Sequence, residues 1–257
     1  MNTILLALAV LPVIILGIVV YRQDKYQREP LGKLLKAFFF GALSIIPAFF
    51  MEQFLSYFTP GIPGIDGIFQ GYIVAGCSEE FWKLAMLTLA IWRSREFDEY
   101  FDGIVYACFV SLGFACFENI GYVFGQESYI TALHTGWARA IMSVPGHFFF
   151  GVMMGYYFAL AKFQPAHKWS NLFKAFFVPM LMHGTFDALL MIPESLAEDG
   201  GYTWLAQSIS GVLFIVFIIF DIKLWKWGIR RIKRLQELSQ QQDFDRNKPF
   251  DNFTWNF

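Results

Sequence analysis

Seven long apolar stretches constrain this chain most, because each is long enough to form a helix that crosses a bilayer. Such a helix needs about 20 predominantly apolar residues. The stretches lie near residues 3–21, 37–58, 67–92, 103–125, 141–162, 172–192 and 203–223. Charged residues make up only 16% of the sequence, whereas soluble domains contain about 25%. The sequence therefore predicts an all-α, polytopic transmembrane helix bundle with about seven spans, and it argues against a soluble globular enzyme.

The distribution of Lys and Arg predicts the orientation of these spans. If the N-terminus lies outside, the inner segments hold 18 of the 20 basic residues. These segments are 22–36, 93–102, 162–174 and the region from 223 onward. The exceptions are Lys83, within a span, and Arg139, in an expected outer loop. Because Lys and Arg concentrate in cytoplasmic loops, we expect the N-terminus outside and the C-terminus in the cytoplasm.

This pattern also divides the chain into two parts. Residues 1–225 are expected to form the transmembrane helical domain, and residues 226–257 a basic and then polar cytoplasmic tail. Trp225 and Trp227 flank the start of the basic segment, which is typical of a short amphipathic helix that lies on anionic lipid. The expected partner of this segment is therefore the lipid bilayer, and no nucleic acid is expected to bind it.

Ionisable side chains at membrane depth are the second informative feature. Placing one such group at the centre of a spanning helix costs about 2.5–3.5 kcal/mol, so several of them cannot face lipid separately. We expect them to meet inside the bundle around a hydrated cavity, in the outer half of the bilayer or near its centre. They are Glu79, Glu80 and Lys83 in the third stretch, Glu118 in the fourth, His147 in the fifth, and His183 and Asp187 in the sixth.

Helical spacing predicts which of these side chains share a face. Glu79 and Lys83 are four residues apart, and Glu80 and Lys83 are three apart, so both carboxylates reach the same ammonium. Lys83 can then hold one carboxylate ionised, which leaves the other placed to exchange a proton with water. One-turn spacing also joins His183 with Asp187 and Glu118 with Tyr122, and Asn119 is adjacent to Glu118.

Four short motifs contain these residues in a fixed order along the chain. They are E-E-x-x-K at Glu79–Lys83, F-x-x-x-E at Phe114–Glu118, P-G-H-F-F-F-G around His147, and H-x-x-x-D at His183–Asp187. Their order and spacing resemble the PrsW intramembrane proteases of bacteria, over about residues 22–190. The wider superfamily, which includes the CAAX prenyl endopeptidases, usually has E-E-x-x-x-R and F-x-x-x-H. Lys83 and Glu118 therefore fit the PrsW branch.

The resemblance implies an endopeptidase in the bacterial inner, or plasma, membrane. Its substrate would be a single-span membrane protein, such as an anti-sigma factor, cleaved near the outer side of the membrane. The implied catalytic residues are Glu79, Glu80, His147, His183, Glu118 and Asp187, with Lys83, Asn119 and Tyr122 in support. In the glutamic scheme that we favour, one Glu of the pair deprotonates a water molecule and the two histidines stabilise the oxyanion. This scheme needs no cofactor.

Other readings of the same residues remain open at this point. Glu118, His147 and His183 can instead form a His₂Glu zinc site with Glu79 as base, although ligands from three separate spans give no local spacing signal. Buried carboxylates and histidines at one depth also suit a proton- or cation-coupled transporter. A third hypothesis is a non-catalytic module that binds a membrane partner.

Overall fold

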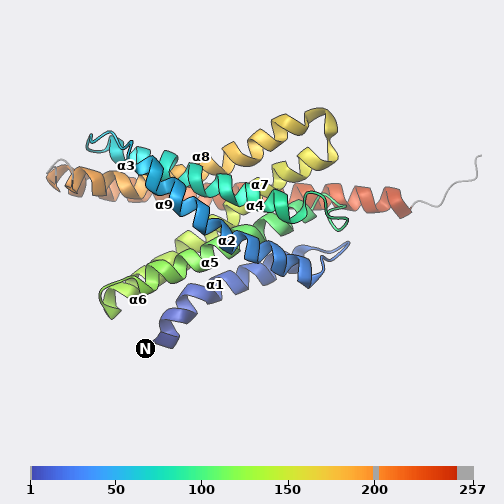
Figure 1. Ribbon diagram of the computed structural model, residues 1–257, viewed down its shortest axis with the longest axis horizontal. Helices are drawn as coiled ribbons and strands as arrows, with labels where there is room; N and C mark the ends of the chain where they lie inside the picture. The colour runs from blue at the N-terminus through green and yellow to red at the C-terminus, as the bar shows by residue number, and fades with distance from the viewer. Residues whose placement is uncertain (1, 199–202, 248–257) are drawn as a thin grey trace, which may run out of the picture.

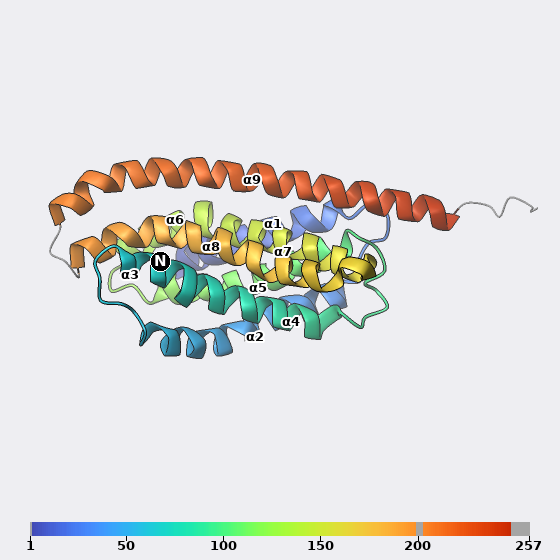
Figure 2. The same cartoon turned by 90° about the horizontal axis from the view of Figure 1, so that it is seen from above.

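The computed structural model describes residues 2–198 and 203–247, and this part of the chain is built of helices that run alongside one another (Figure 1). The main helices are α1 (Asn2–Gln23), α2 (Leu31–Ser56), α3 (Ile65–Phe69), α4 (Ser78–Ile91), α5 (Asp102–Phe124), α6 (Tyr129–Ala138), α7 (Val144–Phe163), α8 (Lys168–Glu198) and α9 (Thr203–Asn247). Two π-helical segments, η1 (Gln70–Cys77) and η2 (Arg139–Ser143), and a 3₁₀ turn, η3 (Pro165–His167), join some of them. Figure 2 shows α9 extending along the whole bundle.

Six segments of the described chain are long and apolar enough to cross a membrane, which confirms a polytopic helical protein. They are Asn2–Gln23, Leu31–Ser56, Asp102–Phe124, Tyr129–Phe163, Pro165–Ala197 and Ala206–Arg246. The stretch predicted as the third span is also helical, as the continuous run α3, η1 and α4. It does not count among the six because Glu79, Glu80 and Lys83 interrupt its apolar sequence.

Two boundaries differ from those expected from the sequence. The fifth span begins at Tyr129 instead of near residue 141, because Ser128 caps α6 and the helix then continues through η2 into α7. Arg139 therefore lies within a helix and not in an outer loop. At the other terminus, α9 continues to Asn247, so the first part of the expected tail extends the last span. Residues 248–257 of that tail lie outside the described residues.

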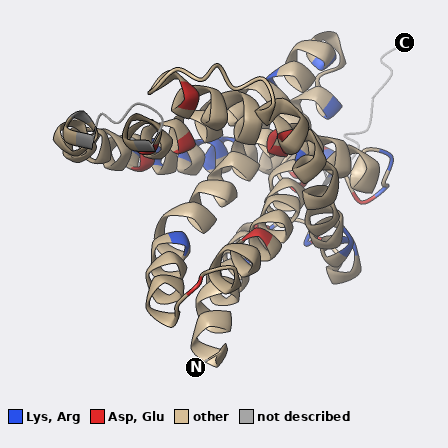
Figure 3. Ribbon diagram, turned by 60° about the vertical axis from the view of Figure 1, so that its left-hand side comes forward, with Lys and Arg blue, Asp and Glu red and all other residues tan. Residues whose placement is uncertain are grey.

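The centre of the bundle is formed by α5 and α7. Within an 18-residue apolar stretch of each span, 78% of the residues are buried in α5 and 89% in the span that contains α7, but only 28% in α1 and 11% in α9. The outer helices expose large apolar side chains such as Ile15, Leu43 and Ile215. Figure 3 shows how little of the helical ribbon carries charge. These faces have the character of surfaces that contact lipid.

Small residues allow α2 to lie directly against α5. A Cβ atom added at Gly41 of α2 would overlap the carbonyl oxygen of Val110, and one added at Gly113 of α5 would overlap that of Phe38. Contacts of this kind let helix backbones touch inside a membrane, where packing is a main source of association energy. This crossing fixes α5, and with it Glu118, relative to α2.

The loops predicted to lie on the inner side meet at one end of the bundle, which we call the loop end. Gln236 of α9 donates to the carbonyl oxygen of Gln23 at 2.9 Å, and Gln242 donates to that of Asp98 at 2.8 Å. The Nζ atom of Lys162 donates to the carbonyl oxygen of Trp92 at 2.7 Å. The predicted orientation requires this grouping of the basic segments.

Candidate active site

A cavity of about 550 Å³ lies between α2, α5, α8 and the helical runs that contain α4 and α7. Six of the residues singled out from the sequence line it: Glu79, Glu118, Tyr122, His147, His183 and Asp187. Glu80, Lys83 and Asn119 lie behind this lining, and all three are fully buried. Side chains from four separate predicted spans therefore meet around one cavity, as expected.

Both π-helical segments directly precede site residues. Segment η1 ends at Cys77, immediately before the first turn of α4 with Glu79 and Glu80. Segment η2 ends at Ser143, and α7 then begins with the turn that carries His147. A π-helical turn inserts extra backbone into a helix, which changes the direction of the residues that follow, and such turns are frequent at functional sites. The local helix geometry thus sets the direction of the catalytic candidates.

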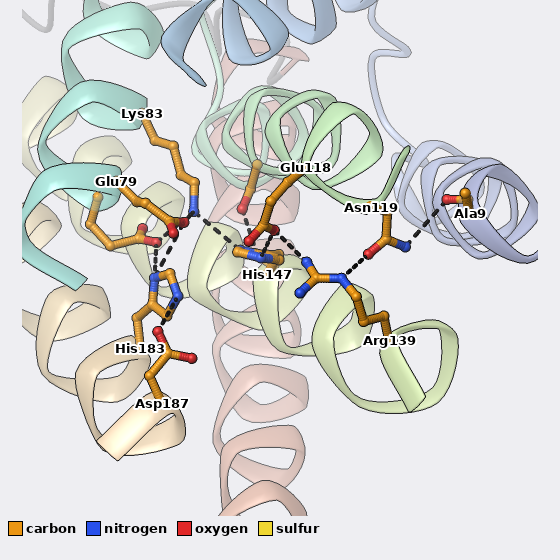
Figure 4. Close-up of polar contacts among 11 residues, drawn as sticks. Ala9, Glu79, Lys83, Glu118, Asn119, Arg139, His147, His183 and Asp187 are labelled. Atoms are coloured by element: carbon orange, nitrogen blue, oxygen red, sulfur yellow. Dashed lines mark hydrogen bonds and ion pairs between the residues drawn. The ribbon is translucent and has the colours of Figure 1, made fainter. Parts of the chain in front are cut away.

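Lys83 is the centre of the polar network (Figure 4). Its Nζ atom lies 3.0 Å from Oε2 of Glu79, 2.8 Å from Oε1 of Glu80 and 3.1 Å from Nδ1 of His147. An ammonium group has three N–H donors and no acceptor, so these contacts use all of its hydrogen-bonding capacity. The ring of Phe114 covers the same nitrogen, with its centroid 4.1 Å away, and adds a cation–π contact.

His183 connects the glutamate pair to Asp187. Its Nδ1 atom lies 2.9 Å from Oε1 of Glu80, and its Nε2 atom lies 3.2 Å from Oδ2 of Asp187. Because ionised carboxylates only accept hydrogen bonds, the imidazolium form of His183 satisfies both contacts. The ring also stacks on Phe150, with centroids 4.8 Å apart and planes 21° apart, which fixes its orientation.

His147 connects Lys83 to Glu118. The Lys83 ammonium donates to Nδ1, so the neutral tautomer of His147 carries its proton on Nε2 and donates to Oε2 of Glu118 at 2.8 Å. The same oxygen of Glu118 lies 2.7 Å from Nη2 of Arg139. The network therefore runs without a break from α8, through α4 and α7, to α5 and η2.

Asn119 and Tyr122 act on this network through Arg139. The Nε atom of Arg139 donates to Oδ1 of Asn119 at 2.5 Å, and Asn119 in turn donates to the carbonyl oxygen of Ala9 at 3.3 Å. The carbon of the guanidinium lies 4.1 Å from the centroid of the Tyr122 ring. Both residues therefore contact the guanidinium group that pairs with Glu118.

The network contains more acidic than permanently basic groups. Its carboxylates are Glu79, Glu80, Glu118 and Asp187, and its cations are Lys83 and Arg139. Excess negative charge is costly in a buried site, so protons shared among the histidines and carboxylates must balance it. A site that holds exchangeable protons beside a cavity suits general acid–base chemistry.

Part of the network has the donor atoms of a metal centre. This part consists of four residues, and one ligand atom from each lies within 4.8 Å of those of the other three. The residues are Glu79, Glu80, His147 and His183. Imidazole and carboxylate donors suit zinc. This group differs from the ligand set expected from the sequence, because it has the glutamate pair in place of Glu118. Lys83 donates to three of the four members, so a metal ion here would displace its ammonium.

Arg139 and Glu52 are two charged residues of the cavity that the sequence did not connect with the site. Arg139 was assigned to an outer loop, although an isolated basic residue outside the positively charged inner segments was a signal for it. Glu52, in α2, also lines the cavity. No charged residue lies at helical spacing from Glu52, so its relation to the site depends on how α2 packs.

Comparison with known proteins agrees with this geometry. Residues 29–220 match a family model described as "PrsW family intramembrane metalloprotease". The chain belongs to this family. It is 34% identical to Protease PrsW of Clostridioides difficile, over 93% of this chain and 94% of that protein. It is 32% identical to Protease PrsW of Geobacillus kaustophilus, over 86% and 88% of the two chains. The corresponding values for Protease PrsW of Bacillus subtilis are 30%, 86% and 91%.

Membership in the PrsW family confirms the resemblance carried by the four motifs. The chain is a peptidase and a multi-pass membrane protein, with relatives in bacteria, and its substrate is a protein. Membership favours the peptidase hypothesis over the transporter and the binding module. No solved structure matches the chain.

Proposed function

We propose that this PrsW-family protein is an intramembrane endopeptidase of the glutamic type, in which Glu79 activates the attacking water. The supporting observation is that the cavity reaches only one carboxylate of the glutamate pair. The side chain of Glu79 lines the cavity and is 8% exposed, whereas that of Glu80 is 0% exposed and does not line it. Water in the cavity therefore has access to Glu79, and Glu80 serves to hold Lys83 and His183.

In this scheme Glu79 is first a general base and then a general acid. It removes a proton from water while the oxygen of that water attacks the carbonyl carbon of the scissile peptide bond. It then gives the proton to the leaving amine as the carbon–nitrogen bond breaks. Lys83, 3.0 Å away, limits the build-up of negative charge while Glu79 is ionised. No group outside the chain has to supply or receive a proton.

We assign stabilisation of the oxyanion to His183 and His147, whose rings both line the cavity. Asp187 orients His183 through the contact at Nε2, and Glu118 orients His147 in the same way. A substrate carbonyl oxygen that enters the cavity competes with these carboxylates for the ring N–H donors. Because both rings are already held in place, stabilising the developing negative charge requires an exchange of hydrogen-bond acceptors but no movement of the rings.

A zinc-dependent form of the same protease is the second candidate, favoured by the four-residue ligand group and by the family's description. Its ion would be held by Glu79, Glu80, His147 and His183, and it would supply a polarised water molecule. The donor types fit zinc. We favour the metal-free form because Lys83 already neutralises this point and uses all three of its donors there.

We further propose that the cavity faces the outer side of the bacterial inner, or plasma, membrane, with the N-terminus outside and the C-terminus in the cytoplasm. This orientation is supported by the basic segments, which gather at the loop end, where Asp102 begins α5. At about 1.5 Å per residue, Asp102 and Glu118 lie roughly 24 Å apart along α5. The proposed substrate is a single-span membrane protein, such as an anti-sigma factor, cleaved in its outer half.

The test uses purified full-length protein in detergent with a candidate single-span substrate, and identifies products by mass. We expect Glu79→Gln to reduce the cleavage rate by about 10²–10⁴-fold, because the amide cannot take a proton from water. The matched control is Glu127→Gln, the same chemical change at an exposed position outside the cavity. Melting temperatures establish that both variants are folded. Cleavage at the wild-type rate by Glu79→Gln rejects the proposed base.

Treatment with a strong zinc chelator separates the two catalytic types. Unchanged cleavage after removal of metal supports the glutamic scheme. Loss of cleavage that added zinc restores supports the second candidate, and in that case Lys83 has to move when the ion binds.

A further inference from the structure

A second group of buried carboxylates lies at the loop end of the bundle, away from the cavity. Asp24 follows α1, Glu99 lies in the loop before α5, and Asp102 is the first residue of α5. All three residues are buried. One carboxylate oxygen from each lies within 4.8 Å of one from each of the others. The proposed peptidase mechanism does not use this group.

Two of these carboxylates accept backbone N–H groups through one oxygen each. The Oδ2 atom of Asp24 accepts the backbone N–H of Glu29 at 3.0 Å. The Oδ2 atom of Asp102 accepts the backbone N–H groups of Asp98, at 3.0 Å, and of Glu99, at 2.8 Å. These bonds fix the direction of each carboxylate, as the ligands of an ion site require.

Two of the remaining oxygens have no partner. Oδ1 of Asp24 and Oε1 of Glu99 are buried and lack a hydrogen-bond partner in residues 2–198 and 203–247. Asp102 also contacts the carboxyl group of the buried Glu29. Buried polar atoms are nearly always bonded, so two such oxygens on residues this close together point to a missing group. No Lys, Arg or His nitrogen of the described chain forms an ion pair with any of these three residues. The nearby Arg246 pairs with Asp98 instead, at 3.3 Å.

We propose that Asp24, Glu99 and Asp102 form a binding site for a hard divalent cation of the Ca²⁺ or Mg²⁺ type. Such ions are bound by carboxylate oxygens. Ca²⁺ binds oxygen at about 2.3–2.6 Å, so opposite ligands lie roughly 4.6–5.2 Å apart. The three ligand oxygens lie within 4.8 Å of one another, so one ion of this kind can contact all of them.

The site connects two segments that are distant in the sequence, and a third segment packs beside it. Asp24 belongs to the connection between α1 and α2, and Glu99 and Asp102 to the entrance of α5. The distal part of α9 packs beside them, because the backbone N–H of Phe101 donates to Oγ of the buried Ser239 at 2.9 Å. A cation bound here braces the loop end of the bundle and does not take part in peptide hydrolysis.

The test measures cation binding by the full-length protein in detergent after chelation and dialysis. Isothermal titration and melting temperature are recorded with CaCl₂, MgCl₂ and, for comparison, NaCl at equal ionic strength. We expect one saturable divalent site and a rise in melting temperature of about 5–10 °C when the ion is in large excess over its dissociation constant. NaCl is expected to have no such effect. Wild-type protein that shows neither binding nor a shift overturns the proposal.

Variants locate the site. Glu99→Gln and Asp24→Asn are expected to lose both the titration signal and the shift, while Glu237→Gln, an exposed carboxylate on α9, keeps both. Equal binding by all variants rejects these residues as ligands. Should a variant melt too early for the shift to be read, paramagnetic resonance of bound Mn²⁺ in wild-type protein, competed by Ca²⁺, still gives the stoichiometry. Glu79→Gln keeps this site intact, so a signal that persists in it does not come from the cavity.

Discussion

Two buried groups of carboxylates lie toward opposite ends of α5 and differ in how their charge is balanced. In the cavity network, Glu79, Glu80, Glu118 and Asp187 contact Lys83, Arg139 or one of two histidines at hydrogen-bond distance. At the loop end, Asp24, Glu99 and Asp102 have no basic partner within ion-pair distance in the described chain. The same chemical group is thus neutralised by side chains at one end and left for a proton or a cation at the other.

The difference reflects what each end has to do. A site that admits substrate and water needs charges that stay in place when its contents change, and covalently attached cations provide that. A junction between loops has no such requirement, and an ion that binds only the assembled loops stabilises the folded state by mass action. The same kind of substitution is therefore predicted to change the stability of the protein in opposite directions at the two ends.

Substitution of Lys83 by Met is expected to have the largest effect. It leaves Glu79 and Glu80 without their shared cation, and breaking a buried ion pair costs about 3–5 kcal/mol. Cleavage is expected to be lost, and the melting temperature in detergent to fall steeply. Lys226→Met, at an exposed position of α9, is the control and should leave both unchanged. If Lys83→Met is as stable as wild type, the ammonium group of Lys83 is not needed to neutralise Glu79 and Glu80.

A carboxylate-to-amide change at each end should shift stability in opposite directions. Glu80→Gln weakens the contacts to Lys83 and His183 and is expected to lower the stability by about 2–4 kcal/mol. Glu99→Gln removes an unpaired charge, and its new amide can donate to the free oxygen of Asp24. In chelator at pH 8 it is expected to raise the stability by roughly 0.5–2 kcal/mol.

Denaturant or thermal melts of both variants and wild type, in parallel, measure these shifts. With saturating Ca²⁺, wild type should become more stable than Glu99→Gln, because wild type binds the ion and Glu99→Gln does not. If both variants are less stable than wild type in chelator, the carboxylate charge is neutralised by the protein at both ends, and the predicted difference is wrong.

The loop end should also make the metal-free protein less stable at high pH. Burial raises the pKa of Glu99 to about 8, and the charge of Asp24 adds to the effect. Burial likewise raises the pKa of Asp24 to about 6. A carboxyl with a higher pKa in the folded chain contributes stability at low pH, which is lost as the pH rises through that value.

We therefore expect the melting temperature in chelator to fall between about pH 5 and pH 8.5. The fall should be smaller with Ca²⁺, which replaces the protons. In Glu99→Gln, the part of the fall near pH 8 should disappear. A melting temperature that does not change with pH in chelator would contradict the raised pKa values of these carboxyl groups.

Much of the fold followed from apolar stretch length, because a membrane permits few alternatives to a helix. The boundaries were harder to predict. Arg139 was predicted to lie in a loop before the fifth span, because its charge interrupts the apolar sequence of the run that leads into α7. The extension of α9 to Asn247 depends on contacts with the loop end, including that of Ser239, and such tertiary contacts have no local pattern.

The candidate site was predictable where helical spacing or membrane depth carried the signal. Lys83 was placed with Glu79 and Glu80 because pairs three and four apart share a face, and the cost of isolated charge in lipid required the histidines to join them. Arg139 and the proposed cation site were not found in this way. Their partners lie on other helices or in loops, where spacing gives no information.

The smallest expected effect is at the edge of the cavity network, where Tyr122 is 49% exposed. Its ring stacks on Arg139, and a cation–π contact at an exposed position is worth about 0.5–1 kcal/mol. Tyr122→Leu is therefore expected to reduce kcat/KM by roughly two- to fivefold, while Tyr122→Phe, which keeps the ring, should match wild type. A large loss in Tyr122→Phe would instead assign a role to the hydroxyl group.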